Sequence, residues 1–482
     1  MSTGYWFKGR RRCLVFLLIM FIVNVLIIPA GSWGSPPKTR AAVADPPIIY
    51  GVRPGNMAFT FDRTPTISAL LAKGGADLNP ASITITLDGE NVTASAQLDF
   101  DPAVQKGRLA FTPDADLSYG EHDVTIAVSD VSGQNQQYSW FFVIDGQLSS
   151  QPHFYYGNLH SHTSYSDGQG IPAEAYEYAY NEWLDFLAVT DHSQYLEGDR
   201  YDPAGKEFTA QPGSEWSRTA DMARAFNNTH KDFLALRGFE MTFPELGHIN
   251  VLNTDKYVEA VSTMTTLEEF YAWLAKQPGA VAEFNHPGWP DTSFDNLAYS
   301  QHADRVINLI ETGNGLIPHA YTRFEEYYYK ALDKGWHVGA VNVQDNHAAN
   351  WGDADNLTVV VADRLTTDEF FRALRERRIY STESRSLQLT VKGNGHWMGS
   401  VLDISPGDPL NLEILAVDDI NPIAGLSLIT DGGHSIAVQE VNGTAAEWRP
   451  RVIPGAGAHW YVVKVTHENG KLGFSSPIFT NF

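Results

Sequence analysis

Cysteine is almost absent from this 482-residue chain. The only one is Cys13, close to the N-terminus. Disulfide bonds within the chain and thiolate metal sites in its body are therefore excluded, and stability must come from packed cores or bound metal. If the chain is exported, this lack of disulfides is more typical of a bacterial envelope protein than of a eukaryotic secreted one.

Positive charge is also scarce. Lys and Arg together number 34 against 57 Asp and Glu, which gives a formal net charge of -23 at pH 7. Such a chain repels polyanions, so nucleic acid is excluded as an expected partner. A small anionic substrate would need local positive charge, which metal ions could supply.

Long hydrophobic runs are missing except near the N-terminus, where an apolar stretch extends from Leu14 to Ile28 behind Lys8 and Arg10–Arg12. This pattern is typical of a secretory signal, and the run is shorter than the roughly 20 residues that span a membrane. We expect residues 1–35 to be a signal peptide. The alternative is a retained signal-anchor, which would be the only part of the chain expected to contact a membrane. Residues 36–47 read as a linker.

Residues 48–147 predict a β-sandwich of immunoglobulin-like type. Short segments of alternating apolar and polar residues are separated by turn signals such as Asp88-Gly89, and no helical period intervenes. The expected strands are Ile67–Leu71, Ser82–Leu87, Arg108–Thr112, His122–Ser129 and Tyr138–Val143.

Residues 153–384 change to strands that alternate with helices, which is typical of a parallel α/β barrel. The expected strands are Phe154–Leu159, Phe186–Thr190, Phe233–Phe239, Ile249–Leu252, Val281–Phe284, Val306–Ile310, Val338–Val343 and Leu357–Val361. The expected helices are Pro172–Trp183, Thr266–Lys276, Ala320–Lys334 and Thr366–Arg378. The last begins with a capping threonine and an acidic first turn.

Residues 386–482 return to strand patterns and predict a second β-sandwich. The expected strands are Leu387–Val391, Leu410–Val417, Leu426–Ile429 and His459–Thr466, with turns at Asp431–Gly433 and Asn469-Gly470. Neither sandwich carries a recognisable catalytic cluster.

Histidines and carboxylates gather at the ends of the expected central strands. His160 and His162 are two residues apart, so on an extended segment both side chains point the same way and can reach one ion. The candidate metal ligands are His160, His162, Asp167, His192, Glu240, His248, His286, Asp345 and His347. Most follow the carboxyl end of a strand, where barrel sites are built, whereas His248 precedes its strand.

This ligand set indicates the chemistry of the ions. Imidazoles with carboxylates and no thiolates suit Zn, Mn or Fe better than an all-oxygen Ca or Mg site. Buried together without metal, these groups would be mutually unfavourable through desolvation and like charge. We therefore expect two to three divalent ions.

The central segment, from about Phe154 to Glu383, resembles the polymerase and histidinol phosphatase (PHP) superfamily. The resemblance is carried by Asn-Leu-His160-Ser-His162-Thr, Ser-Asp167-Gly, Thr-Asp191-His192, Gly-Phe-Glu240, Gly-His248, Asn-His286-Pro and Asp345-Asn-His347. It implies a distorted (β/α)7 barrel with a trinuclear site. His160, His162, Glu240 and Asp345 would hold the first ion. Glu240 would bridge to a second ion held by His248 and His286, and Asp167, His192 and His347 would hold the third.

The resemblance further implies a hydrolase, and with the expected signal segment we expect it to act in the bacterial periplasm, in the cell envelope or outside the cell. The favoured function is hydrolysis of a small phosphate ester by a hydroxide shared between ions, with Asp191 and His319 as candidate acids for the leaving group. The family's exported branch includes carbaryl-type carbamate hydrolases, so a carbamate, ester or amide is the alternative substrate. A binding protein with structural metals is the third hypothesis. Gln344 and Asn346 replace small residues expected there, which we expect to affect the substrate pocket.

Overall fold

The computed structural model describes residues 45–260, 262–277, 279–405 and 407–481. The expected signal segment 1–35, Cys13 and the linker up to residue 44 lie outside these ranges. Across the described residues, no helix combines the length and the apolar character needed to cross a membrane.

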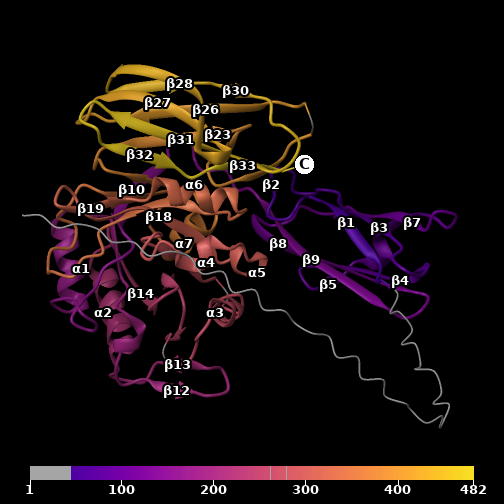
Figure 1. Cartoon of the computed structure of the whole chain (residues 1–482), viewed down its shortest axis with the longest axis horizontal. Coiled ribbons are helices and arrows are strands. Elements are labelled where there is room, and N and C mark those ends of the chain that lie inside the picture. Colours follow the sequence, from indigo (N-terminus) through magenta and orange to yellow (C-terminus); the bar gives the residue numbers. More distant parts are fainter. Residues whose placement is uncertain (1–44, 261, 278, 406, 482) are drawn as a thin grey trace, which may run out of the picture. The chain divides into compact units, whose positions relative to one another are not determined.

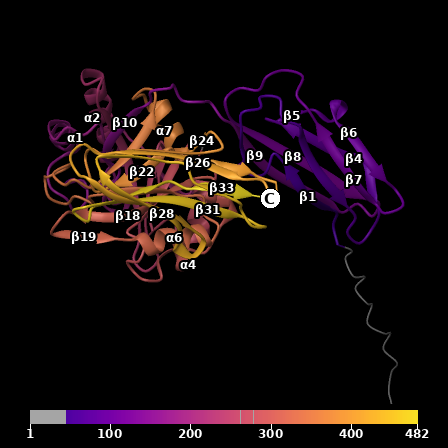
Figure 2. The ribbon, with the colours of Figure 1, turned by 90° about the horizontal axis from the view of Figure 1, so that it is seen from above.

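The N-terminal strands form two sheets around one core (Figure 2). One sheet has the order β1 (Ile48–Arg53), β3 (Ile67–Ala72), β7 (Lys106–Phe111) and β6 (Gln97–Asp101). The other has the order β2 (Phe59–Thr60), β9 (Asn135–Ile144), β8 (Gly120–Asp130), β4 (Leu78–Leu87) and β5 (Glu90–Asn91), with a short helix η1 (Thr93–Ser95). Buried side chains such as Leu71 from the first sheet and Ile126 from the second share the core. The five strands expected here are all present, and the two-layer packing is that of a sandwich.

The central region is built on one large sheet (Figure 1). Its strands are β10 (His153–Asn158), β11 (Phe186–Val189), β14 (Leu234–Phe243), β15 (Gly247–Leu252), β17 (Val281–Asn285), β18 (Ile307–Leu316), β19 (Ala320–Arg323), β20 (Gly339–Val343), β21 (Leu357–Ala362) and β22 (Ile379–Thr382). All eight central strands expected from the sequence are present. Several are fully buried along their length, as expected of strands covered on both faces.

The prediction of a parallel (β/α)7 barrel is not confirmed. Pairing is parallel for β10–β11, β11–β14, β17–β18 and β18–β20, but antiparallel for β14–β15, β15–β17, β10–β21 and β21–β22. Strand β20 pairs with β18, and no ladder joins β20 to β21 among the described strands. These two strands meet instead through Thr358, whose hydroxyl accepts from Asn342 N–H at 3.1 Å and donates to Asn342 O at 3.0 Å.

Seven α-helices accompany this sheet within the described ranges. They are α1 (Pro172–Asn181), α2 (Glu215–Thr229), α3 (Leu267–Leu274), α4 (Ser293–Leu297), α5 (Gln301–Asp304), α6 (Glu325–Asp333) and α7 (Thr367–Arg375). The capping prediction for α7 is confirmed, because the Thr366 side chain accepts from Glu369 N–H. The single helix expected over Ala320–Lys334 is wrong in its first turn: Ala320–Arg323 forms β19, which pairs antiparallel with β18.

Two further features were not expected from the sequence. Helix α2 has a mostly polar sequence and buries only Trp216, Thr219 and Ala223, so its apolar stripe is narrow. A small sheet of β12 (Arg200–Asp202), β13 (Glu207–Thr209) and β16 (Lys256–Tyr257) and the short helix η2 (Ser193–Tyr195) lie in the connections.

The C-terminal strands form two layers around a second core, as predicted (Figure 1). One layer contains β23 (Gln388–Gly393), β24 (His396–Trp397), β26 (Leu410–Val417), β29 (Ala445–Trp448) and β30 (Arg451–Val452). The other contains β27 (Ile423–Thr430), η3 (Asp431–Gly433), β28 (His434–Gly443), β31 (His459–His467), β32 (Leu472–Ser475), β33 (Ile478–Asn481) and β25 (Val401–Asp403). Strand β32 pairs antiparallel with β22, so this second layer continues the central sheet.

Candidate metal centre

The fold brings the nine predicted ligands together in one cluster. Three groups have ligand atoms within 4.8 Å of one another: His162, Asp167, His192 and His347; His160, His162 and Glu240; and His192, Glu240 and His248. His286 Nε2 lies 3.5 Å from Glu240 Oε1, and Asp345 Oδ1 lies 3.1 Å from His162 Nε2. The described cluster is thus compatible with a site for several metal ions.

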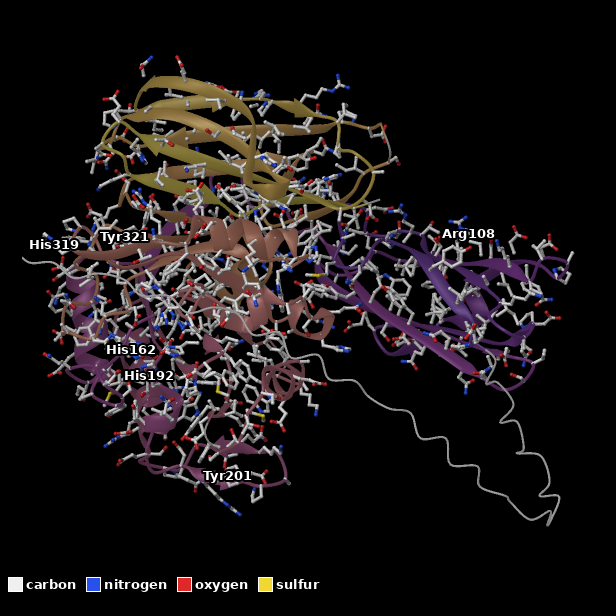
Figure 3. All side chains as sticks on the ribbon, in the orientation of Figure 1. Arg108, His162, His192, Tyr201, His319 and Tyr321 are labelled. Atoms are coloured by element: carbon white, nitrogen blue, oxygen red, sulfur yellow. The ribbon has the colours of Figure 1, made fainter. Side chains whose placement is uncertain are left out.

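The backbone explains why these side chains converge. His160 and His162 follow β10, and isolated bridges pair Ser161 with Asn346 and His192 with Glu240. These bridges align the residues that follow β10, β11 and β20 with the second half of β14. His192 and His162 lie close together in this region of Figure 3.

His248, the one candidate that precedes its strand, is explained by antiparallel pairing. Strand β15 runs opposite to β14, and their register places His248 beside Thr242 and Asn250 beside Glu240. The beginning of β15 therefore lies at the same sheet edge as the end of β14. His248 Nδ1 is 3.0 Å from Glu240 Oε1.

Glu240 occupies the centre of the cluster. Its Oε1 lies 3.4 Å from His160 Nε2 and 3.0 Å from His248 Nδ1. Its Oε2 lies 3.6 Å from His162 Nε2 and 2.7 Å from His192 Nδ1. The two oxygens of one buried carboxylate thus face different histidines, which is the arrangement that a bridging carboxylate needs.

The donor atoms around Glu240 fit a metal ion better than a hydrogen-bonded core. His160 Nδ1 lies 2.8 Å from Glu311 Oε1, so donation of Nδ1–H to Glu311 leaves the Nε2 lone pair facing the cluster. There it meets His162 Nε2 at 3.1 Å. Glu240 Oε2 and Asp345 Oδ1 are buried and accept no hydrogen bond of normal geometry from the described residues.

The distances between the candidate donor atoms also fit a bound metal ion. Bonds from zinc to nitrogen and oxygen are about 2.0–2.2 Å, so two ligands of one ion lie roughly 3.0–3.5 Å apart. His160 Nε2 is 3.3 Å and His162 Nε2 is 3.1 Å from Asp345 Oδ1. Asp345 Oδ1 is buried and receives no hydrogen bond of normal geometry at these distances, so a cation between the three atoms would compensate its burial.

The electrostatics of the protein alone shift the pKa values in opposing directions. Burial lowers the pKa of His160, but Asp345 and Glu240 outweigh burial and hold this pKa well above its ordinary value. At His162 burial prevails, and its pKa is lowered. Burial alone would raise the pKa of Glu240, yet His160 and the other histidines bring it well below its usual range. The cluster therefore favours a charged carboxylate at its centre.

One side of the cluster is open to solvent. The side chains of His160, His162 and Glu240 are fully buried, whereas those of His347 and Asp167 are 42% and 47% exposed. His347 Nδ1 lies 2.9 Å from Asp345 O, an arrangement that leaves Nε2 directed toward Asp167 Oδ1 at 3.3 Å. The cluster is thus buried at His160, His162 and Glu240 and accessible to solvent at Asp167 and His347.

Asp191, a predicted acid, is fully engaged in hydrogen bonds. Its carboxylate accepts from Thr163 N–H and the Thr163 hydroxyl, each at 2.7 Å, and from the Ser166 hydroxyl at 2.6 Å. The Ser166 Oγ also lies 3.3 Å from His162 Nδ1. Asp191 therefore holds the segment that carries His162 and Asp167.

His319, the other predicted acid, is not brought to the cluster. It is exposed in the turn between β18 and β19, where its N–H donates to Leu316 O at 3.0 Å. In Figure 3 it lies well apart from His162 and His192. An exposed turn residue at that place has no geometry for donating a proton at the cluster.

The residues that support the candidate ligands were not predicted from the sequence. Glu311 accepts the His286 N–H and, at 2.9 Å, the side-chain N–H of Asn314 as well as facing His160. Asn285 donates to Glu240 Oε1 at 2.8 Å. Glu283 is buried nearby, and burial, with the charge of Glu311, raises its pKa well above the usual range. An acidic residue inside an apolar strand run was the available signal for Glu311 and Glu283.

Gln344 and Asn346 differ from the role predicted for them. Gln344 is buried and donates to Ala354 O at 2.9 Å and Asn356 O at 3.2 Å. Asn346 accepts from the Asn158 side chain at 3.1 Å. Both side chains brace the loop after β20 from inside, so they shape the position of Asp345 and His347 rather than a pocket wall.

A cavity of about 1180 Å³ lies elsewhere and is lined by none of the nine ligands. It is bordered by Ala235–Arg237 at the beginning of β14, Lys256 and Trp273. Glu240 lies further along β14, so this cavity belongs to the opposite end of the strand from the cluster.

Comparison with models of protein families found no match, and comparison with curated proteins found none either. Among solved structures, the chain is similar to a two-domain protein containing a predicted PHP-like metal-dependent phosphoesterase from Bacteroides vulgatus. Identity is 17%, coverage is 70% of this chain and 97% of that chain, and the TM-score is 0.38. It is also similar to fibronectin(III)-like modules of CbhA from Clostridium thermocellum, at 19% identity over 19% of this chain and 90% of that chain, with a TM-score of 0.14. A third likeness is to CopC from Methylosinus trichosporium OB3b, at 18% identity over 20% of this chain and 93% of that chain, with a TM-score of 0.16.

Proposed function

We propose that this protein is an exported hydrolase of phosphate esters that works with two or three bound divalent ions. The observation that carries the proposal is the position of Glu240, whose two buried oxygens face separate histidines. A single structural ion would need one closed set of about four ligands. A central carboxylate shared by three overlapping ligand groups, with one side exposed, suits a reactive multi-ion centre better.

We assign the ligands as follows. His160, His162, Glu240 and Asp345 hold the first ion, Glu240 with His248 and His286 hold the second, and Asp167, His192 and His347 hold the third. The short distances around Asp345 support the first set, and the exposed Asp167–His347 pair supports the third. Zn, Mn and Fe all match these imidazole and carboxylate donors.

The charge of the chain supports an anionic substrate only when ions are bound. Among the described residues, Asp167, Glu240 and Asp345 form ion pairs with histidines alone and with no lysine or arginine. When bound, divalent ions lower the pKa of coordinated water to roughly 7 and offset negative charge on phosphate oxygens. The phosphate group would approach from the exposed side.

The residues of the chain then have defined tasks. Glu311 fixes the tautomer and orientation of His160. Asp191 fixes the loop of Thr163 and Ser166, and with it His162. These supports hold the donor atoms in place before substrate arrives, which lowers the cost of binding charge.

Export and the domain division belong to the same proposal. The basic and apolar pattern of residues 1–35 supports a signal segment, and residues 48–147, 153–384 and 386–482 are proposed as a sandwich, a metal-bearing domain and a second sandwich. The large core shared by central and C-terminal residues, including Phe284 and Phe474, supports a close association of the last two.

Metal analysis and a substrate panel test the proposed function. The purified protein, loaded with Zn or Mn, should hold at least two equivalents of metal and hydrolyse phosphomonoesters or phosphodiesters. Glu240→Gln should lose one or more equivalents and most activity, whereas Glu245→Gln, at the exposed turn of the same β14–β15 hairpin, should retain both. Hydrolysis of carbamates but not of phosphate esters would show that the substrate is a carbamate. Fewer than two equivalents of bound metal would refute the multi-ion centre.

A further inference from the structure

Two exposed aromatic side chains stand at the ends of a row of ligand histidines. Tyr195 is 53% exposed and its ring centroid lies 5.9 Å from that of His192. Trp289 is 51% exposed and its ring lies 5.8 Å from that of His286. Between them, the ring of His248 lies 5.7 Å from His192 and 4.8 Å from His286. The row therefore runs from Tyr195 through three imidazoles to Trp289.

Both aromatic residues are placed by the same local device. Tyr195 and Trp289 each follow a ligand histidine by three residues, in His192-Ser-Gln-Tyr195 and His286-Pro-Gly-Trp289. In each case the backbone N–H of the aromatic residue donates to the backbone carbonyl oxygen of the histidine at 3.1 Å, which closes a tight turn. The position of each aromatic ring is thus tied to the position of a metal-binding ring.

Trp289 is also supported from behind. The buried Phe324 meets its indole edge-on, at 5.3 Å between centroids and 85° between planes. The indole is therefore held by packing while half of it stays in solvent. Single exposed aromatics are common on proteins, but two that are fixed by matching turns beside one reactive cluster form a built surface.

We propose that Tyr195 and Trp289 bind a planar aromatic group of the substrate, so that the protein acts on phosphate esters of phenols. This inference rests on the proposed phosphoesterase function. The phosphate would sit at the metal-binding histidines, and the aromatic ring would lie against the indole or the phenol at an end of the row. Stacking on an aromatic side chain favours flat groups over other shapes and tolerates differences in their substituents.

The leaving group of such an ester needs little protonation, which suits a site where neither predicted acid is free to donate a proton. Water supplies the oxygen that bonds to phosphorus, the bond from phosphorus to the aryl oxygen breaks, and the aryl oxide departs with the bonding electron pair. The proton released from water passes to solvent, and the aryl oxide is protonated there. A phenol has a pKa near 10, against 15.7 for water, so its anion leaves with little help from a general acid. Asp191 is occupied by three hydrogen bonds and His319 lies elsewhere, which agrees with this requirement.

The test compares phenyl phosphate with ethyl phosphate in the metal-loaded full chain. Because each substrate is compared with itself across variants, the difference in intrinsic reactivity cancels. Trp289→Ala should lower kcat/KM for phenyl phosphate about tenfold or more and leave ethyl phosphate within about twofold, and Tyr195→Ala should act in the same direction. Trp289→Phe should recover most of the loss. Trp183→Ala, at the 88% exposed tryptophan after α1, is the matched control.

Binding of unreactive phosphonates gives a second readout. By calorimetry, phenylphosphonate should bind more tightly than methylphosphonate to the wild type, and Trp289→Ala should remove that difference while metal content stays unchanged. If both phosphates are hydrolysed and the variants affect them equally or not at all, the inference is overturned while the phosphoesterase function stands. If neither phosphate is hydrolysed and neither phosphonate binds, the inference is overturned, and the phosphoesterase function is overturned with it if phosphodiesters are not hydrolysed either.

Discussion

The Nδ1 atom of His160 lies 2.8 Å from Oε1 of Glu311, and both side chains are fully buried. The second oxygen of Glu311 accepts the backbone N–H of His286. One carboxylate therefore orients two candidate ligands that come from different strands. Such a support makes the ligand geometry independent of the ion and raises the basicity of the imidazole that binds it.

Replacing this carboxylate should weaken metal binding without removing a ligand. Glu311→Gln keeps an oxygen that can face His160 but loses the charge that holds its Nδ1–H, so metal affinity should fall about 10- to 100-fold. Competition with a chelator measures the change. Glu326→Gln, at an exposed position in α6, is the control and should bind metal like the wild type. Equal affinities of Glu311→Gln and the wild type would contradict this role.

Asp191→Asn should separate a positioning role from a proton-donating one. Asparagine turns an N–H toward the Thr163 and Ser166 donors, so we expect a lower Tm and looser binding of metal at His162. At saturating metal, the dependence of kcat/KM on pH should keep its shape because no titrating acid has been removed. Disappearance of the basic limb in Asp191→Asn would instead identify Asp191 as the acid.

His319→Ala should leave the reaction unchanged. Its exposed position in the β18–β19 turn predicts a kcat/KM within about twofold of the wild type for every hydrolysed substrate. Removal of His347, which is 42% exposed but lies 3.3 Å from Asp167, should by contrast lower metal content. A large loss of kcat in His319→Ala with intact metal content would show that this turn moves to the cluster.

The stability of the fold should carry a signature of Asp185. Burial raises the pKa of this carboxyl to about 6 from 3.8, with the charge of Asp232 adding to the effect and the Tyr156 N–H opposing it. The folded state therefore holds a proton that the unfolded state releases between pH 4 and 6, and stability contributed by this group falls as pH rises through that window. Above pH 6 the charged form costs up to about 3 kcal/mol.

Asp185→Asn should remove that cost while retaining an acceptor for Tyr156 N–H, which donates to Asp185 at 2.7 Å. The Tm of the variant should match the wild type near pH 4 and exceed it at pH 7. Asp221→Asn, on the exposed face of α2, should show no such divergence. A constant difference in Tm between Asp185→Asn and the wild type at both pH values would contradict the shifted pKa.

The sequence predicted most of the strands because their apolar patterns record burial on one or both faces. It predicted the cluster because side chains at the carboxyl ends of neighbouring parallel strands lie close together, as His160 after β10 and His192 after β11 do. It did not predict the antiparallel β14–β15 and β15–β17 pairs, since pairing direction depends on backbone hydrogen bonds that are common to all residues. The antiparallel pairing of β15 with β14 explains why His248, which precedes its strand, lies beside Glu240.

Other parts of the site were hidden for different reasons. Ala320–Arg323 extends the helical pattern of the residues after it, and its strand form depends on the partner β18. The placement of Glu311 beneath His160 joins residues 151 positions apart, and no local pattern specifies that contact. The exposure of Trp289 likewise depends on how distant segments pack around it, which no local sequence pattern specifies.

The pairing of β22 with β32 has a consequence for how the molecule can be cut. Backbone hydrogen bonds join these strands, and Glu383, just after β22, accepts the Leu472 N–H at 3.0 Å and pairs with Arg323. A chain ended at residue 384 would lose this partner strand at once and present a bare strand edge, the form of surface on which other chains add and aggregate. We therefore expect the smallest stable fragment that carries the candidate metal ligands to include the C-terminal strands, which pair with the edge of the sheet that holds these side chains.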